Sequence, residues 1–225
     1  MNNVTADVRS ARVPRRTWLQ RAVYVFLRFL ARMTSVVLVG MKVVGRHHFP
    51  RRGGVLLCSN HQSVLDPILI GLQCNRRLNY LARRSLFRNP WFSGLIRFLD
   101  AIPIEREGMG LEGLRETLRR LRGGEVVLIF PEGTRSPDGE LQPLKPGFCA
   151  VAKRAEATIV PVALDGAHIA WPRHRSWPLP ARIAVAFGPP ILPQDIQRMT
   201  AEELVEELQR RLAECHRRAR QLRCA

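Results

Sequence analysis

The stretch "GVLLCSNHQSVLDP", residues 54–67, decides the fold class. Its first half is an apolar run that lacks the alternation of polar and apolar residues typical of a strand with one face in water. Such a strand is expected inside a sheet that helices cover on both sides. The second half is polar and sets His61 five residues before Asp66. The order predicts a buried strand followed by a polar turn that opens a helix.

Five more apolar runs have the same character and are predicted to be strands. They are "RLNYLAR" (77–83), "DAIPIER" (100–106), "EVVLIFP" (125–131), "ATIVPVAL" (157–164) and "RIAVAFG" (182–188). Between two of them, leucines recur every three or four residues from Leu111 to Leu121, which predicts a helix that ends at Gly123-Gly124. Strands that alternate with helices indicate an α/β fold, with a mostly parallel or mixed central sheet covered by helices.

The 225 residues suit one domain, residues 43–225, preceded by a basic N-terminal tail, residues 1–42. Residues 18–44 are mostly apolar, but they carry Arg21, Arg28 and Arg32 on one helical face. This pattern predicts amphipathic helices that lie in a membrane interface, the alternative being an ordinary helix packed on the domain. A last helix is predicted to begin at Thr200 with a capping box to Glu203 and to present a solvated charged face.

The charge of the chain is strongly positive. Lysine and arginine number 36 against 19 aspartates and glutamates, a formal net charge of +17. Such an excess attracts either nucleic acid phosphates or anionic lipid head groups, or it reflects a general bias toward arginine. Eleven of the basic residues fall between Arg9 and Arg52, which places much of the excess near the N-terminus.

Neither a metal site nor export is indicated. The five cysteines have no CxxC spacing and no zinc pattern, so a reducing cytoplasm is favoured. Apolar runs stay short of eighteen residues, and the first apolar segment lacks the flanks of a signal peptide.

His61 and Asp66 are candidates for a catalytic pair. An imidazole just after a strand could accept a proton from a hydroxyl, and a carboxylate on its other nitrogen would fix the tautomer. Taken alone, the spacing favours a polar turn without catalytic function, and the catalytic interpretation depends on the motifs that accompany it.

Two further strand ends carry groups suited to a phosphate. In "IFPEGTRSPDG" (129–139), Gly133 allows close backbone approach, while Thr134 and Arg135 supply a hydroxyl and a forked cation. Arg106 ends another predicted strand, where an ion pair with a neighbouring glutamate is the alternative. Together with His61, these groups outline a site for an alcohol that bears a phosphate.

Four motifs in order, "NHQSVLD", "IPIER", "FPEGTRS" and "IVPVAL", resemble the glycerolipid acyltransferase family, particularly bacterial 1-acyl-glycerol-3-phosphate acyltransferases. The resemblance covers roughly residues 43–190 and extends to the N-terminal amphipathic segment, which is similar to the family's membrane anchor. "LKPGFCAVA" (144–152) matches a basic, glycine-containing stretch of the family. Pro103 and Glu105 depart from the family pattern, which leaves the acceptor open.

The resemblance implies that His61 is the general base and Asp66 its orienting partner. It further implies a substrate-binding role for Asn60, Arg106, Glu132, Gly133, Thr134, Arg135 and Lys145. Pro161 would belong to a structural motif near the acyl donor.

The implied reaction moves a fatty acyl group from acyl-CoA or acyl carrier protein to the hydroxyl of 1-acyl-glycerol-3-phosphate, which gives phosphatidic acid. Neither a metal nor a bound cofactor is expected, because the thioester is already activated. Absence of a Gly-x-Ser-x-Gly elbow argues against a serine nucleophile. The expected location is the cytoplasmic face of an anionic membrane, and no nucleic-acid partner is expected. Alternatives are glycerol-3-phosphate, lyso-ornithine lipid or another lysophospholipid as acceptor, or a non-enzymatic basic membrane-binding protein.

Overall fold

The computed structural model describes residues 40–83, 101–104, 110–172, 175 and 177–225. Residues 18–39 of the predicted N-terminal helical stretch and Arg106 fall outside these residues. In chain order the elements are β1 (Lys42–Val44), η1 (Arg46–His48), β2 (Val55–Ser59), α2 (Asp66–Gln73), β3 (Leu78–Arg83), β4 (Ala101–Ile104), α4 (Gly110–Arg122), β5 (Val126–Ile129), α5 (Gly147–Ala155), β6 (Thr158–Asp165), α6 (Ala167–Ala170), β7 (Ala184–Phe187), α7 (Pro193–Arg198) and α8 (Ala201–Cys224).

The described strands form one sheet in the order β1-β7-β6-β2-β5-β3-β4. Neighbours run parallel, except that β6 and β7 are antiparallel. This confirms the predicted α/β fold with a mostly parallel, mixed sheet. All six predicted strands are present.

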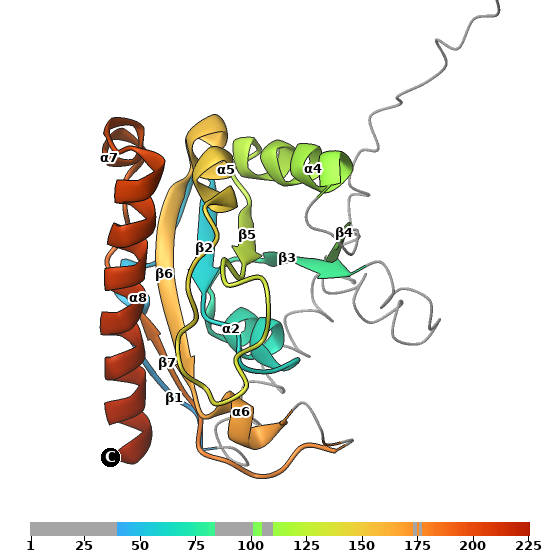
Figure 1. Cartoon of the computed structure of the whole chain (residues 1–225), viewed down its shortest axis with the longest axis vertical. Coiled ribbons are helices and arrows are strands. Elements are labelled where there is room, and N and C mark those ends of the chain that lie inside the picture. Colours follow the sequence, from blue (N-terminus) through green and yellow to red (C-terminus); the bar gives the residue numbers. More distant parts are fainter. Residues whose placement is uncertain (1–39, 84–100, 105–109, 173–174, 176) are drawn as a thin grey trace, which may run out of the picture.

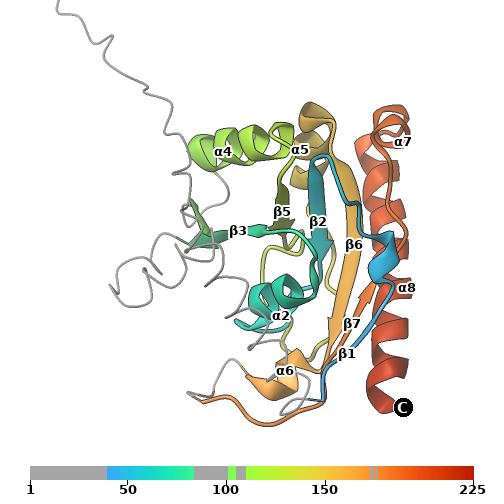
Figure 2. The same cartoon turned by 180° about the vertical axis from the view of Figure 1, so that it is seen from behind.

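Helices cover both faces of the sheet, as the apolar run of β2 predicted. Val55 and Leu57 pack in a core on the face that α2 covers, whereas Leu56 and Cys58 pack with residues of α4, α5 and α8 on the other. All four side chains have 0% exposure. Helix α8 runs along β6, with α4 and α5 at the opposite end of the sheet from α6 (Figures 1 and 2).

The last three residues of the predicted N-terminal helical stretch instead form β1. Lys42 pairs with Ala184 and Val44 with Ala186, so β1 joins the edge of the sheet next to β7. The helical prediction is wrong at these positions because pairing with a distant strand outweighs the local pattern. The sheet therefore begins at Lys42, one residue before the predicted domain start.

Helix α8 has the predicted start. The side chain of Thr200 accepts from the backbone of Glu203 at 3.1 Å, and Glu203 accepts from the backbone of Thr200 at 2.7 Å, which completes the capping box. Its buried leucines pack against the sheet. Of the helices in the described part of the chain, none is long and apolar enough to cross a bilayer.

Candidate active site

His61 lies just beyond the carboxyl end of β2, where the polar turn leads into α2. Its Nδ1 is 2.8 Å from Oδ2 of Asp66, the first residue of α2. The turn thus brings together two side chains five positions apart. The imidazole keeps partial access to solvent, with its side chain 21% exposed, while that of Asp66 is 0% exposed. The predicted pair is present, and it has the geometry of a base with an oriented tautomer.

The Asp66 carboxylate is held by the backbone of the same turn. Its Oδ2 accepts from the amides of Gln62 at 2.6 Å and Ser63 at 2.7 Å. An oxygen that already accepts two N–H groups is an acceptor toward His61 as well. Nδ1 of His61 therefore carries the proton, and Nε2 is left to accept one.

Phe130 fixes the plane of the imidazole. Its ring stacks on that of His61, with centroids 3.9 Å apart and planes at 16°. Phe130 follows β5, and β5 pairs in parallel with β2, so both residues emerge at the same edge of the sheet. Sequence reasoning missed Phe130, although its place directly before the Pro-Glu-Gly-Thr-Arg motif was the available signal.

Glu132, predicted to bind substrate, supports the backbone around His61 in this structure. Its side chain is buried, and its carboxylate accepts from the amides of His61 and Gln142, both at 3.2 Å. Burial raises the pKa of Glu132 to about 7, although these two amides act in the opposite direction, and the Asp66 carboxylate adds to the increase. The carboxylate links the turn that carries His61 to Gln142 in the loop after β5.

Stability should therefore fall as Glu132 ionises. A folded-state pKa of about 7 lies above the ordinary 4.5, so between these values the folded chain binds more protons than the unfolded one. Raising the pH through this window should cost up to about 3 kcal/mol of unfolding free energy. Glu132→Gln removes the titration, so the free energy of unfolding of the parent should decrease relative to this variant from pH 4.5 to 7.5 in urea titrations.

The control for this titration is Glu206→Gln, at an exposed position on α8. A difference between parent and Glu132→Gln that stays constant across the pH range would contradict the raised pKa.

The remaining residues predicted to bind substrate differ in burial. Asn60 is buried, and its amide exchanges hydrogen bonds of 3.0 and 2.9 Å with the backbone of Leu164, which ties β2 to β6. Gly133 and Thr134 are exposed, and Gly133 has a φ of 72°. A Cβ at Gly133 would lie 3.0 Å from Nζ of Lys145, so the glycine leaves room for that ammonium group.

Arg135 is partly buried beside this exposed turn. The structure thus brings Gly133, Thr134, Arg135 and Lys145 onto the loop that leaves β5, the strand next to His61. Among the described residues, no cluster of three or more histidine, cysteine, aspartate or glutamate side chains is arranged to hold a metal.

The family model described as "Acyltransferase" matches residues 40–165. The chain belongs to the acyltransferase family. The match includes the His61–Asp66 pair and the loop after β5, and it confirms the resemblance found in the sequence. The match also rules out the alternative of a non-enzymatic membrane-binding protein. The chain is an O-acyltransferase.

Two proteins with similar sequences have the same name. The 1-acyl-sn-glycerol-3-phosphate acyltransferase of Bacillus subtilis (strain 168) is 27% identical over 203 residues, which are 87% of this chain and 99% of that protein. The enzyme of the same name from Limnanthes douglasii is 31% identical over 70% of this chain and 56% of its own length. The chain therefore spans nearly all of the bacterial relative but little more than half of the plant one.

The fold is shared with a solved structure. It is the 1-acyl-sn-glycerophosphate (LPA) acyltransferase PlsC from Thermotoga maritima, with a TM-score of 0.76 at 23% identity. The superposition covers 92% of this chain and 82% of that one.

Proposed function

We propose that this acyltransferase moves a fatty acyl group from an acyl thioester to the free hydroxyl of 1-acyl-glycerol-3-phosphate, giving phosphatidic acid. The observation that carries the proposal is the contact between His61 and Asp66, which prepares an imidazole to accept a proton. The relatives' names supply the acceptor.

In the proposed reaction, Nε2 of His61 takes the proton of the acceptor hydroxyl as its oxygen attacks the thioester carbonyl. A carbon–oxygen bond forms and the carbon–sulfur bond breaks, and the departing thiolate takes the proton from the imidazolium. Asp66 stabilises that imidazolium through Nδ1. No acyl-enzyme is needed, because both substrates are bound together and the thioester is already activated.

The acceptor's phosphate is proposed to bind at the exposed loop beside His61. Lys145 supplies an ammonium group next to Gly133, where the absence of a side chain makes room for it. Thr134 and Arg135 add a hydroxyl and a guanidinium group. Asn60 and Glu132 would then act indirectly, because their side chains are engaged with backbone groups.

The proposal extends to the surroundings of the enzyme. The donor is acyl-CoA or acyl carrier protein, and the reaction uses neither metal nor bound cofactor. Residues 1–42 hold the protein at the cytoplasmic face of an anionic membrane, as their charge and amphipathic pattern suggest. Deletion of residues 1–40 should abolish cosedimentation with anionic liposomes, and unchanged binding would contradict the anchor.

The test of the reaction is thiol release from acyl-CoA in the presence of 1-acyl-glycerol-3-phosphate, repeated with acyl carrier protein as donor. Glycerol-3-phosphate, lyso-ornithine lipid and lysophosphatidylcholine serve as competing acceptors. Preference for 1-acyl-glycerol-3-phosphate supports the proposal. Equal rates with the acceptor that lacks phosphate would contradict the phosphate site, and inactivity with both donors would contradict the reaction.

A further inference from the structure

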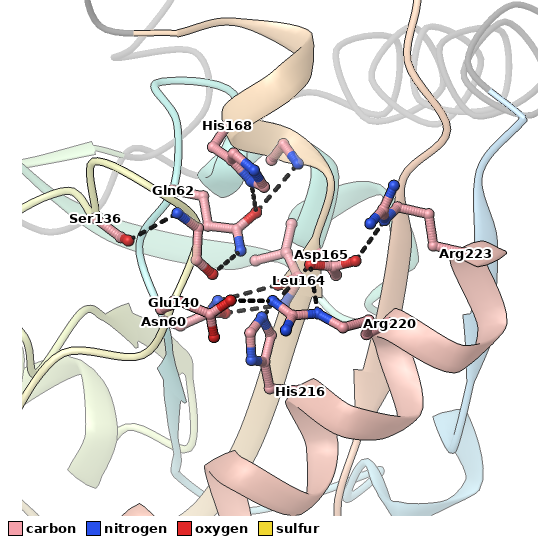
Figure 3. A network of polar contacts seen from close by, with 12 residues as sticks. Asn60, Gln62, Ser136, Glu140, Leu164, Asp165, His168, His216, Arg220 and Arg223 are labelled. Carbon is pink, nitrogen blue, oxygen red and sulfur yellow. Dashed lines mark hydrogen bonds and ion pairs between the residues drawn. The ribbon is translucent and has the colours of Figure 1, made fainter.

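The C-terminal turns of α8 contact the loop after β5, here called the active-site loop. Helix α8 itself lies beyond residues 40–165 of the family match. The polar face of this helix was predicted to be solvated charge. That prediction is wrong for His216, Arg220 and Arg223, which meet the carboxylate of Asp165 at the end of β6 (Figure 3).

Asp165 is the buried carboxylate that these three side chains contact. Its side chain is 0% exposed, and one oxygen accepts from Nε of Arg223. The other oxygen lies 3.5 Å from Nε2 of His216 and 3.6 Å from Nε of Arg220. Burial alone would raise the pKa of Asp165, but His216 and Arg223 outweigh it and hold the pKa at about 2. The Asp165 carboxylate is thus charged, and its contacts hold the C-terminal turns of α8 at the end of β6.

Arg220 extends from this anchor to the loop after β5. Its terminal guanidinium nitrogen donates to Oε1 of Glu140 at 2.6 Å, while its Nε faces Asp165. A guanidinium group can contact two carboxylates at once because its donors form a rigid fork. Arg220 therefore connects a buried carboxylate with an exposed one that belongs to the loop.

The loop segment 136–140, here called the loop tip, contacts the catalytic turn directly. The amide of Ser136 donates to the carbonyl oxygen of His61 at 2.7 Å, and the carbonyl oxygen of Gly139 accepts from Nε2 of Gln62 at 2.7 Å. A Cβ at Gly139 would lie 2.3 Å from Cε1 of His168, so the tip is also packed closely against α6.

We propose that Arg220 is a positioning residue, which holds the loop tip against His61 and thereby sets the place of Gly133, Thr134 and Arg135 in the same loop. Exposed ion pairs contribute little to global stability. With 43% and 54% of their side chains exposed, Arg220 and Glu140 should affect the position of the loop more than the melting temperature.

The test compares Arg220→Ala with Arg210→Ala in the full chain. Arg210 is a matched control, because it lies on the same helix and pairs with Glu207 at 2.9 Å, away from Asp165. Without substrate, hydrogen exchange at the Ser136 amide should become about tenfold faster in Arg220→Ala through local opening, and stay at the parent rate in the control. Unfolding temperatures should remain similar.

A double-mutant cycle with Glu140→Ala tests the link itself. If Arg220 acts through Glu140, the double variant should exchange at Ser136 no faster than Arg220→Ala, since both changes remove the same contact. Additive effects, or parent-like exchange in Arg220→Ala, would overturn the proposal.

Kinetics give a second readout that rests on the proposed function. The KM for 1-acyl-glycerol-3-phosphate should rise about fivefold in Arg220→Ala with kcat within about twofold, because the loop binds the acceptor whereas His61 and Asp66 remain paired. A fivefold loss of kcat with unchanged KM would contradict this role. A parent enzyme without activity would count against the proposed function alone, since the exchange measurement decides the positioning role independently.

Discussion

Replacement of His61 by alanine should lower kcat by about 10²–10⁴-fold, the usual contribution of a general base. Because Nδ1 of the imidazole is bonded to Asp66, Nε2 is left to accept the proton of the acceptor hydroxyl. The fold should persist, because the side chain is partly exposed and its contacts are with Phe130 and Asp66. Thiol release with saturating donor and acceptor measures the effect, with circular dichroism to check folding.

The matched control is His47→Ala, at an exposed histidine on η1. It should keep the parent rate. A folded His61→Ala enzyme that retains the parent kcat would show that the base lies elsewhere, and the assignment of the pair would then be wrong.

Asp66→Asn should lower kcat by about 10²-fold or more with a smaller change in KM. An asparagine oxygen can still accept from the amides of Gln62 and Ser63, so the turn should remain folded. What is lost is the negative charge that fixes the Nδ1–H tautomer and stabilises the imidazolium. Initial rates over a range of acceptor concentrations separate kcat from KM.

Asp195→Asn is the control for that variant. Asp195 also lies in the first turn of a helix, α7, but away from His61. It should leave kcat unchanged. If Asp66→Asn retained kcat within about twofold, Asp66 would be a structural residue of the turn rather than the partner of the base.

The contact between His61 and Asp66 was predictable because it depends on a local turn. His61 and Asp66 are five residues apart, and the turn after β2 places them in contact. This contact does not depend on the order of the strands in the sheet. The structural role of Glu132 was less accessible, since the family resemblance implied a substrate contact for this residue. Its burial and its bond to the amide of His61 follow from the parallel pairing of β2 with β5.

Strand β1 and the inner face of α8 were missed for the same physical reason. The segment Lys42–Val44 becomes a strand by pairing with β7, about 140 residues later in the chain. Arg220 and Arg223 have the spacing of solvated helix residues, and only the location of Asp165 at the end of β6 turns them into ligands of a buried carboxylate.

By itself, the sequence determined the six strands, the start of the last helix at Thr200, the His61–Asp66 pair and the resemblance to the acyltransferase family, because apolar periodicity, capping and turns act over a few residues. Tertiary structure alone decided the order β1-β7-β6-β2-β5-β3-β4. It also decided the bonds between Asn60 and Leu164 and between Arg220 and the active-site loop. These contacts join residues 80 to 104 positions apart, and local preferences carry no information about which distant strand or helix lies alongside.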